Sequence, residues 1–317
     1  MIGDRTYWRS RMVAVATELD LRAVLPATLE EVCARLGLHP RPAEALLNGL
    51  CAMGFLARDG AHYRAGTPLP PVTTPPTPPT PLWTRLRPLL ETGEPQGLHA
   101  GLDFCPEEEA LRRFVAAGEA RSTGCGPALA AAIDWREVET VVDLGGARGG
   151  VLAHVLRAHP HLRGASFDLP AVRPLFDEHV ADLADRMWFH GGDFFADELP
   201  EADVYVLGNL LSDWDDDRCA HLVERAVAVL PPGGMLLLYD ALLDPDRPET
   251  EENWVHALVA QLIGPGGTVN TTDDCRAWFA AAGLTDVEVR PLTGSMSVVL
   301  GTKPGRMWPA RTPVEER

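Results

Sequence analysis

Residues 139 to 150, ETVVDLGGARGG, combine an acidic side chain with a glycine-rich turn that could hold a ligand. A β-branched run ends around Asp143, four glycines follow, and the apolar pattern VLAHVLRAHP then predicts a helix. Because glycine has no Cβ, the main-chain N–H groups of such a turn can approach a ligand closely. The pattern indicates binding of a nucleotide-like cofactor, although the same turn can serve only to pack a helix on a strand.

Two further acidic residues follow predicted strands downstream of this turn. Asp168 ends the strand in GASFDLPAV, where a carboxylate can accept hydrogen bonds from both hydroxyls of a ribose. Asp193 and Phe194 follow a third predicted strand and suit a polar contact to an adenine amine with an aromatic face against the ring. A dinucleotide-binding fold would also carry an acidic residue at 168, so these side chains alone leave the cofactor open.

The elements that position these residues alternate between strands and helices. The segment VYVLGNLLSDWDDDRCAHLVERAVAVLPPGGMLLLYD reads as strand, loop, amphipathic helix, turn and strand. Near the C-terminus, a helix over RAWFAAAGL precedes the strands DVEVRPL and SMSVVLGTK. This order predicts a parallel α/β sheet to which a final hairpin adds an antiparallel strand.

Taken in order, the motifs DLGGARGG, FDLP, GDFF, SDWDD, LPPGG and SMSVVLGTKP resemble those of class I S-adenosylmethionine-dependent small-molecule O-methyltransferases. This family includes plant caffeate-type and bacterial polyketide-tailoring enzymes, and the resemblance covers residues 8 to 303. It implies a Rossmann-like domain with a mostly parallel seven-stranded sheet and an antiparallel last strand, preceded by a small helical winged-helix dimerisation domain. It also implies S-adenosylmethionine as cofactor. The residues implied to bind it are Asp143, Gly145 and Gly149 on the methionine side, Asp168 at the ribose, Asp193 and Phe194 at the adenine, together with Leu169, Asn209 and Trp214.

The catalytic positions depart from the family. Its His-Asp-Trp tripeptide, whose histidine removes a proton from the substrate hydroxyl, is Ser212-Asp213-Trp214 here. A serine hydroxyl is a very poor proton acceptor near neutral pH, so we expect general-base catalysis from this position to be lost. The two glutamates that orient the histidine correspond by spacing to Asp240 and Asp274, which keep the carboxylate on a shorter side chain.

Three further departures concern the cofactor side of the site. The family's lysine four residues before the tripeptide is Gly208. Ala147 and Arg148 occupy positions in the glycine turn where glycine and threonine are commoner. The bulk of Arg148 is expected either to tighten the cofactor pocket or to obstruct part of it.

A replacement base is available in the segment NWVHALVAQLIGPGG, which reads as a helix ended by glycine and proline. His256, Ala260 and Gly264 recur every four residues and therefore share one helix face. By the resemblance, that face points at the substrate, so His256 could act as the base or bind the substrate. The alternative is a histidine that only hydrogen-bonds within a half-buried helix. Phe114 and Trp83 are candidate aromatic residues beside the substrate, or plain core residues.

These features predict a small-molecule substrate and two alternative activities. The first is methyl transfer to an O, C or N acceptor of a small aromatic or polyketide-type metabolite in natural-product biosynthesis. Holding the methyl group and nucleophile in line can supply much of the acceleration without a strong base, which favours an acceptor that is already acidic or activated. The alternative is an enzyme that binds the cofactor but catalyses cyclisation, pericyclic rearrangement or hydroxylation.

Composition limits the location and partners of the chain. A formal charge of −17 over 317 residues disfavours a nucleic-acid partner, because phosphate binding depends on lysine and arginine. The six cysteines show no CxxC pair and no ligand-like spacing with histidine, which argues against a metal site or a disulfide framework and favours the cytoplasm. The sequence shows neither a signal-peptide core nor an apolar run of about 18 residues, so we expect no membrane association.

The N-terminal region has a winged-helix pattern, with two helices and a small hairpin over residues 28 to 66. DNA-binding proteins share this plan, but the second helix, residues 41 to 53, is apolar, and the resemblance assigns the module to homodimer formation. The proline-rich stretch PLPPVTTPPTPPTP predicts an extended spacer. The expected segments are a winged-helix-like dimerisation domain at 1–67, the linker at 68–81, a helical connector and substrate lid at 82–136, the S-adenosylmethionine-binding domain at 137–303 and a tail at 304–317.

Overall fold

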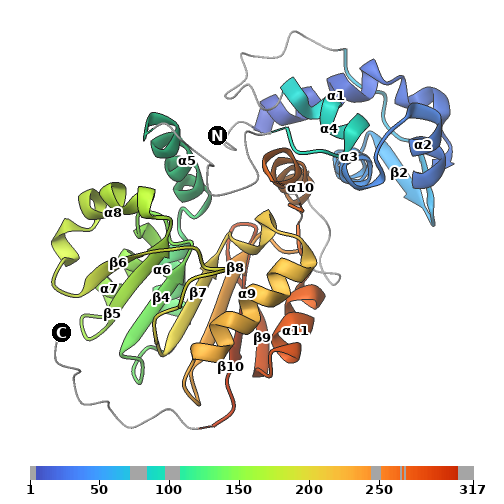
Figure 1. The fold of residues 1–317 in the computed structure, drawn as a ribbon. Coiled ribbons are helices and arrows are strands. Elements are labelled where there is room, and N and C mark those ends of the chain that lie inside the picture. The colour runs from blue at the N-terminus through green and yellow to red at the C-terminus, as the bar shows by residue number, and fades with distance from the viewer. Residues whose placement is uncertain are drawn as a thin grey trace. The chain divides into compact units, whose positions relative to one another are not determined.

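The computed structural model describes residues 5–71, 84–96, 108–243, 251–264, 266–267 and 269–305 (Figure 1). The chain forms two compact units, and neither is continuous in sequence. The first unit contains residues 1–104 with 212–215 and 241–270, and the second contains residues 105–211, 216–240 and 271–317. These units cut across the linear boundaries expected from the sequence, because two segments of the expected cofactor domain pack with the N-terminal residues.

The second unit is built on a seven-stranded sheet in the order β6-β5-β4-β7-β8-β10-β9. The first five strands in that order are parallel, whereas β10 runs antiparallel to both β8 and β9. The strands are β4 (Thr140–Leu144), β5 (Arg163–Asp168), β6 (Met187–Gly191), β7 (Val204–Gly208), β8 (Met235–Asp240), β9 (Thr285–Thr293) and β10 (Met296–Thr302). The Rossmann-like sheet with an antiparallel last strand is confirmed.

The central strands are apolar because both of their faces are covered. The four residues Val204–Leu207 of β7 are buried, as are Leu236–Asp240 of β8. Helix α9 lies across one face of the sheet beside α11 (Figure 1). The helices of this unit are α5 (Glu108–Arg121), α6 (Cys125–Ala132), α7 (Gly150–Ala158), α8 (Arg173–His179), α9 (Asp216–Val229) and α11 (Thr272–Ala281), with short 3-10 turns η3 (Pro170–Val172) and η4 (Ala181–Leu183).

The first unit contains the expected pair of helices and hairpin. Thr28 and Glu31 form a capping box at the start of α2, and Gly37, at φ 66°, ends that helix in the left-handed conformation. Its elements are α1 (Arg5–Glu18), η1 (Leu21–Val24), β1 (Ala27–Thr28), α2 (Leu29–Leu36), α3 (Pro40–Ala52), β2 (Leu56–Asp59), β3 (His62–Ala65), α4 (Leu86–Thr92) and α10 (Glu251–Ile263). The strands form a small antiparallel sheet in the order β1-β3-β2.

Helix α3 is a packing helix of this unit. A Cβ on Gly49 would lie 2.4 Å from Met12 Cε of α1 and 3.3 Å from Trp254 Cβ of α10. Glycine therefore allows three helices to approach closely at this point. Inside the same helix, the buried Asn48 accepts a hydrogen bond of 2.8 Å from the Tyr63 hydroxyl of the hairpin. This burial agrees with the apolar character predicted for the second helix.

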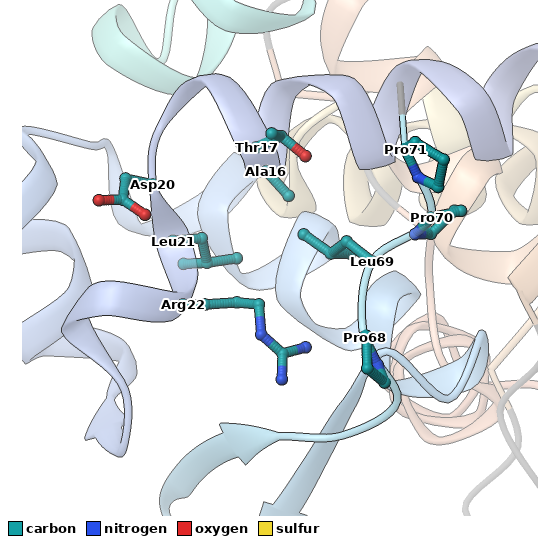
Figure 2. A pocket seen from close by; sticks show the side chains of 9 residues that line it. All are labelled: Ala16, Thr17, Asp20, Leu21, Arg22, Pro68, Leu69, Pro70 and Pro71. Carbon is teal, nitrogen blue, oxygen red and sulfur yellow. The ribbon is translucent and has the colours of Figure 1, made fainter. Parts of the chain in front are cut away.

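The start of the proline-rich segment lines a pocket of about 370 Å³ in the first unit (Figure 2). Leu69 packs against the hydrophobic core of the unit, and Figure 2 shows its side chain pointing toward that of Leu21. Arg22 donates hydrogen bonds to the carbonyl oxygens of Gly66 and Thr67 at the base of this segment. Residues 72–81 of the expected linker and Trp83 lie outside the described residues.

None of the described helices combines the length and the apolar character that crossing a membrane requires.

Candidate active site

The glycine turn lies at the carboxyl end of β4 and leads directly into α7. Its backbone adopts positive φ at Gly145 (67°), Ala147 (48°) and Gly149 (80°). Gly145 and Gly149 tolerate this conformation without a steric penalty, whereas Ala147 holds it with a Cβ present. Gly146 is needed for space, because a Cβ there would lie 2.6 Å from Ser166 Oγ and 2.8 Å from Asp143 Cγ. The turn therefore runs against side chains near the carboxyl ends of the neighbouring strands β4 and β5.

Asp143 is buried beneath this turn, with 3% of its surface exposed. Burial, reinforced by the negative charge of Asp168, raises the pKa of Asp143 to about 8. Among residues 108–243 and 269–305, no ion pair to either carboxylate is found. A cationic ligand would supply the charge that this pair of acidic groups lacks.

Asp168, at the end of β5, holds the turn through its carboxylate. Oδ2 accepts a hydrogen bond of 2.8 Å from the backbone N–H of Ala147, and Oδ1 accepts one of 2.7 Å from Leu169 N–H. Burial raises the pKa of Asp168 to about 6, and the two N–H donors act in the opposite direction. Each carboxylate oxygen has a second lone-pair site, so the group can still accept hydrogen bonds from a diol.

Asp193 and Phe194 follow β6, the strand next to β5. The carboxylate of Asp193 accepts a hydrogen bond of 2.8 Å from Phe195 N–H, which fixes the turn after the strand. The rings of Phe194 and Phe195 meet edge to face at 4.9 Å between centroids. Because carboxyl ends of parallel strands share one edge of a sheet, the structure brings Asp143, Asp168 and this turn together at that edge.

A tyrosine occupies the space above Gly208. Tyr239 of β8 pairs with Gly208 of β7 in the sheet, and a Cβ on Gly208 would lie only 2.0 Å from Tyr239 Cζ. The phenol is hydrogen-bonded to Ser122, whose Oγ accepts a hydrogen bond of 2.9 Å from Asn209 Nδ2. Sequence reasoning missed Tyr239 and Ser122. The available signal was a polar aromatic residue at the end of the buried run LLLYD.

Arg148 forms an ion pair with Glu119 of α5. Glu119 also lies 3.4 Å from Nε2 of His179 in α8. A Cβ on Gly150 would come within 2.4 Å of the same carboxylate, so Glu119 lies against the first residue of α7. The arginine therefore links the glycine turn to α5. Phe114 belongs to the same helix and is half-buried.

Asp240 and Asp274 of the second unit both act electrostatically on Cys275. Asp240 ends β8 and is 6% exposed, whereas Asp274 lies in the first turn of α11. Burial is the main cause of the raised pKa of the Cys275 thiol, and the negative charges of both carboxylates raise it further. Asp274 Oδ2 accepts hydrogen bonds from Thr271 N–H at 2.8 Å and Thr271 Oγ1 at 2.7 Å, so it also caps the helix.

Ser212, Trp214 and His256 belong to the first unit. Ser212 lies in the short turn η5 (Leu211–Asp213), and the half-buried His256 lies in the middle of α10. A Cβ on Gly264 would lie 3.3 Å from the carbonyl oxygen of Asp213. The segment 212–215 therefore packs against the C-terminal end of the helix that carries His256.

Comparison with known proteins shows the family to which the chain belongs. Residues 104–285, more than half of the chain, match the model of the O-methyltransferase domain. The chain belongs to the O-methyltransferase family. It is a methyltransferase, and the cofactor of the family is S-adenosylmethionine.

Three relatives of this O-methyltransferase cover nearly the whole chain. It is 38% identical to the tetracenomycin polyketide synthesis 8-O-methyl transferase TcmO of Streptomyces glaucescens, over 94% of each chain. The O-methyltransferase family 2 protein of Planctomyces limnophilus, solved with apigenin, has a TM-score of 0.72 and 26% identity, covering 94% of this chain and 92% of that one. Human N-acetylserotonin methyltransferase, solved with S-adenosylmethionine, has a TM-score of 0.62 and 25% identity over 94% of each chain.

Proposed function

We propose that this methyltransferase methylates an acidic phenol or enol oxygen of an aromatic, polyketide-type metabolite. Two relatives support this substrate class, since TcmO is named for a polyketide pathway and the Planctomyces protein was solved with apigenin. The observation that carries the proposal is the edge of the sheet where Asp143 and Asp168 adjoin the glycine turn. An acidic acceptor fits the serine at position 212, because such an acceptor needs little help from a base.

The residues at this edge of the sheet fit S-adenosylmethionine in their charge and in the close approach of the glycine turn. Asp143 is buried and Asp168 is half-buried, and neither carboxyl group has an ion-pair partner in residues 108–243 and 269–305. This suits a ligand that carries ammonium and sulfonium charges. The crowded Gly146 shows that the turn runs too close to the strand ends for a larger residue. Bound there, the cofactor supplies an electrophilic methyl group. The proposed ligands are Asp143, Gly145 and Gly149 for the methionyl end, Asp168 for the ribose and Asp193 with Phe194 for the adenine, together with Leu169, Asn209 and Trp214.

The proposed catalytic roles follow from the residues at the substituted positions. The hydroxyl proton of the acceptor passes to His256, because imidazole accepts a proton far more readily than a serine hydroxyl, while Ser212 contributes a hydrogen bond and no base. Asp240 and Asp274 orient polar groups at the acceptor. The acceptor oxygen would receive the methyl group of the bound cofactor, and the acceptor would lose its proton to His256.

Product mass tests this proposal. The purified enzyme is incubated with S-adenosylmethionine and a panel of hydroxylated aromatic polyketides, and the products are analysed by mass spectrometry. We expect a product that is heavier by one CH₂ unit, with an equal amount of S-adenosylhomocysteine. A product of unchanged mass or with one added oxygen would instead indicate rearrangement or hydroxylation.

A pair of variants separates the roles of the two candidate residues. His256→Ala should lower kcat and shift its pH dependence, whereas Ser212→Ala should change kcat only slightly. Equal kcat values and pH profiles for wild type and His256→Ala would remove His256 from the mechanism.

A further inference from the structure

The hydroxyl of Tyr239 lies over Gly208 and has no role in the function proposed above. The two residues are neighbours in the parallel β7–β8 pair, and the phenol ring covers the glycine. The Tyr239 side chain is almost completely buried, with 3% of the residue exposed. Burying a hydroxyl among acidic groups is unfavourable unless it is hydrogen-bonded, so its partners indicate what it can do.

Ser122 links the phenol to the residue that follows β7. Ser122 Oγ accepts a hydrogen bond from Asn209 Nδ2 at 2.9 Å and lies 3.3 Å from the carbonyl oxygen of Gly118. Its hydrogen bond with Tyr239 lowers the pKa of the phenol, which is the effect of a hydroxyl that donates to the phenol oxygen. A phenol oxygen has a second lone pair, so Tyr239 can still accept a hydrogen bond from a ligand.

The charges around the phenol select the kind of donor that would bind there. Burial, followed by the negative charge of Asp143, raises the pKa of Tyr239 well above its usual range, and Asp240 acts in the same direction. The phenol therefore stays neutral, beside two carboxyl groups. An oxygen acceptor in an acidic surrounding suits an ammonium group and disfavours a carboxylate.

We propose that the Tyr239 hydroxyl is a positioning residue that accepts a hydrogen bond from the ammonium group of the cofactor's methionyl end. This inference rests on the proposed binding of S-adenosylmethionine at the glycine turn. Gly208 is needed for this arrangement, because any larger residue at that position would displace the phenol ring of Tyr239. Ser122 and Asn209 orient the phenol and do not touch the ligand in this role.

The test uses two ligands and two isosteric variants. The ligands are S-adenosylhomocysteine and its deaminated analogue, which keeps the carboxylate and lacks the ammonium group. Tyr239→Phe removes the proposed acceptor. Tyr205→Phe is the matched control, since it removes another buried phenol of the same sheet, one that donates to the carbonyl oxygen of Pro200.

We expect Tyr239→Phe to weaken binding of S-adenosylhomocysteine about tenfold, as measured by calorimetry, because one hydrogen bond to a charged group is lost. Binding of the deaminated analogue should be unchanged, and Tyr205→Phe should affect neither ligand. Equal losses for both ligands would show a merely structural role and overturn the proposal. If Tyr239→Phe does not fold, Ser122→Ala replaces it and should show a smaller loss with the same ligand dependence.

The outcome for the wild type separates this inference from the proposed function. A wild-type protein that binds S-adenosylhomocysteine, together with a Tyr239→Phe variant of equal affinity, contradicts only the role of Tyr239. A folded wild-type protein without affinity for the ligand contradicts the proposed cofactor site itself.

Discussion

Asp143 is a residue of the site whose protonation should respond strongly to folding. Its pKa lies at about 8, mainly because of burial and also because of the charge of Asp168. A carboxyl group whose pKa is raised on folding stabilises the folded state below its ordinary pKa near 4, and this contribution is lost as the pH rises through the folded-state value. The window is therefore about pH 4 to 8.

We predict that the free energy of unfolding of the ligand-free enzyme decreases between about pH 5 and pH 8. One group can contribute a slope of at most about 1.4 kcal/mol per pH unit. Urea unfolding at several pH values measures this slope, and Asp143→Asn should make it shallower. A variant with the same slope as the wild type would show that Asp143 does not titrate in this range.

Gly208→Ala should destabilise the protein, because the new Cβ would lie 2.0 Å from Tyr239 Cζ. Overpacking of this kind typically costs about 1–3 kcal/mol, which urea unfolding can resolve. Gly118→Ala is the matched control, since Gly118 lies in a helix and, outside that helix's own backbone, the nearest described heavy atom to its Cβ would be Arg121 Nη2 at 4.0 Å. Full stability of Gly208→Ala would mean that the ring of Tyr239 moves aside without cost.

At the scale of elements, α5 is joined to its neighbours by ion pairs. Arg148 of the glycine turn pairs with Glu119, and Arg112 donates two hydrogen bonds of 3.0 Å to Glu178 of α8. These side chains are partly exposed, so each pair should contribute about 1 kcal/mol or less to stability. Their main effect is expected on the local order of α5.

We predict that Glu119→Gln increases hydrogen–deuterium exchange in α5 while the free energy of unfolding changes by no more than about 1 kcal/mol. Asp134→Asn, which breaks the exposed ion pair with Arg136, is the control and should leave α5 unchanged. Unaltered exchange in α5 for Glu119→Gln would show that the Arg148 pair does not hold this helix.

The elements that sequence reasoning predicted are those with local signals. The glycine turn, the strands ending at Asp168 and near Asp193, and the final antiparallel hairpin all follow from residues adjacent in the chain. The run LLLYD marks Tyr239 as a polar aromatic residue in a buried strand, but the role proposed for it could not be predicted, because that role depends on the glycine opposite it in another strand. The packing of α10 with the N-terminal residues was likewise missed, since an apolar helix does not specify which of two hydrophobic cores it joins.

At the scale of the whole molecule, we propose that the winged-helix-like residues 1–67 join two copies of the chain. Light scattering after gel filtration should then give a mass of twice 34.4 kDa. The alternative use of such a module, DNA binding, is opposed by the formal charge of −17. A mass of 34.4 kDa at micromolar concentration would contradict the proposed homodimer.

The proposed cofactor site is the edge of the parallel sheet where the glycine turn adjoins Asp143 and Asp168. The most direct measurement is calorimetric titration of the folded enzyme with S-adenosylhomocysteine, repeated with Asp168→Asn. We expect saturable binding by the wild type and an affinity at least about tenfold lower for the variant, which loses a charged acceptor. Absence of binding by folded wild-type protein, or equal affinity of the two proteins, would contradict the assignment of this edge as the cofactor site.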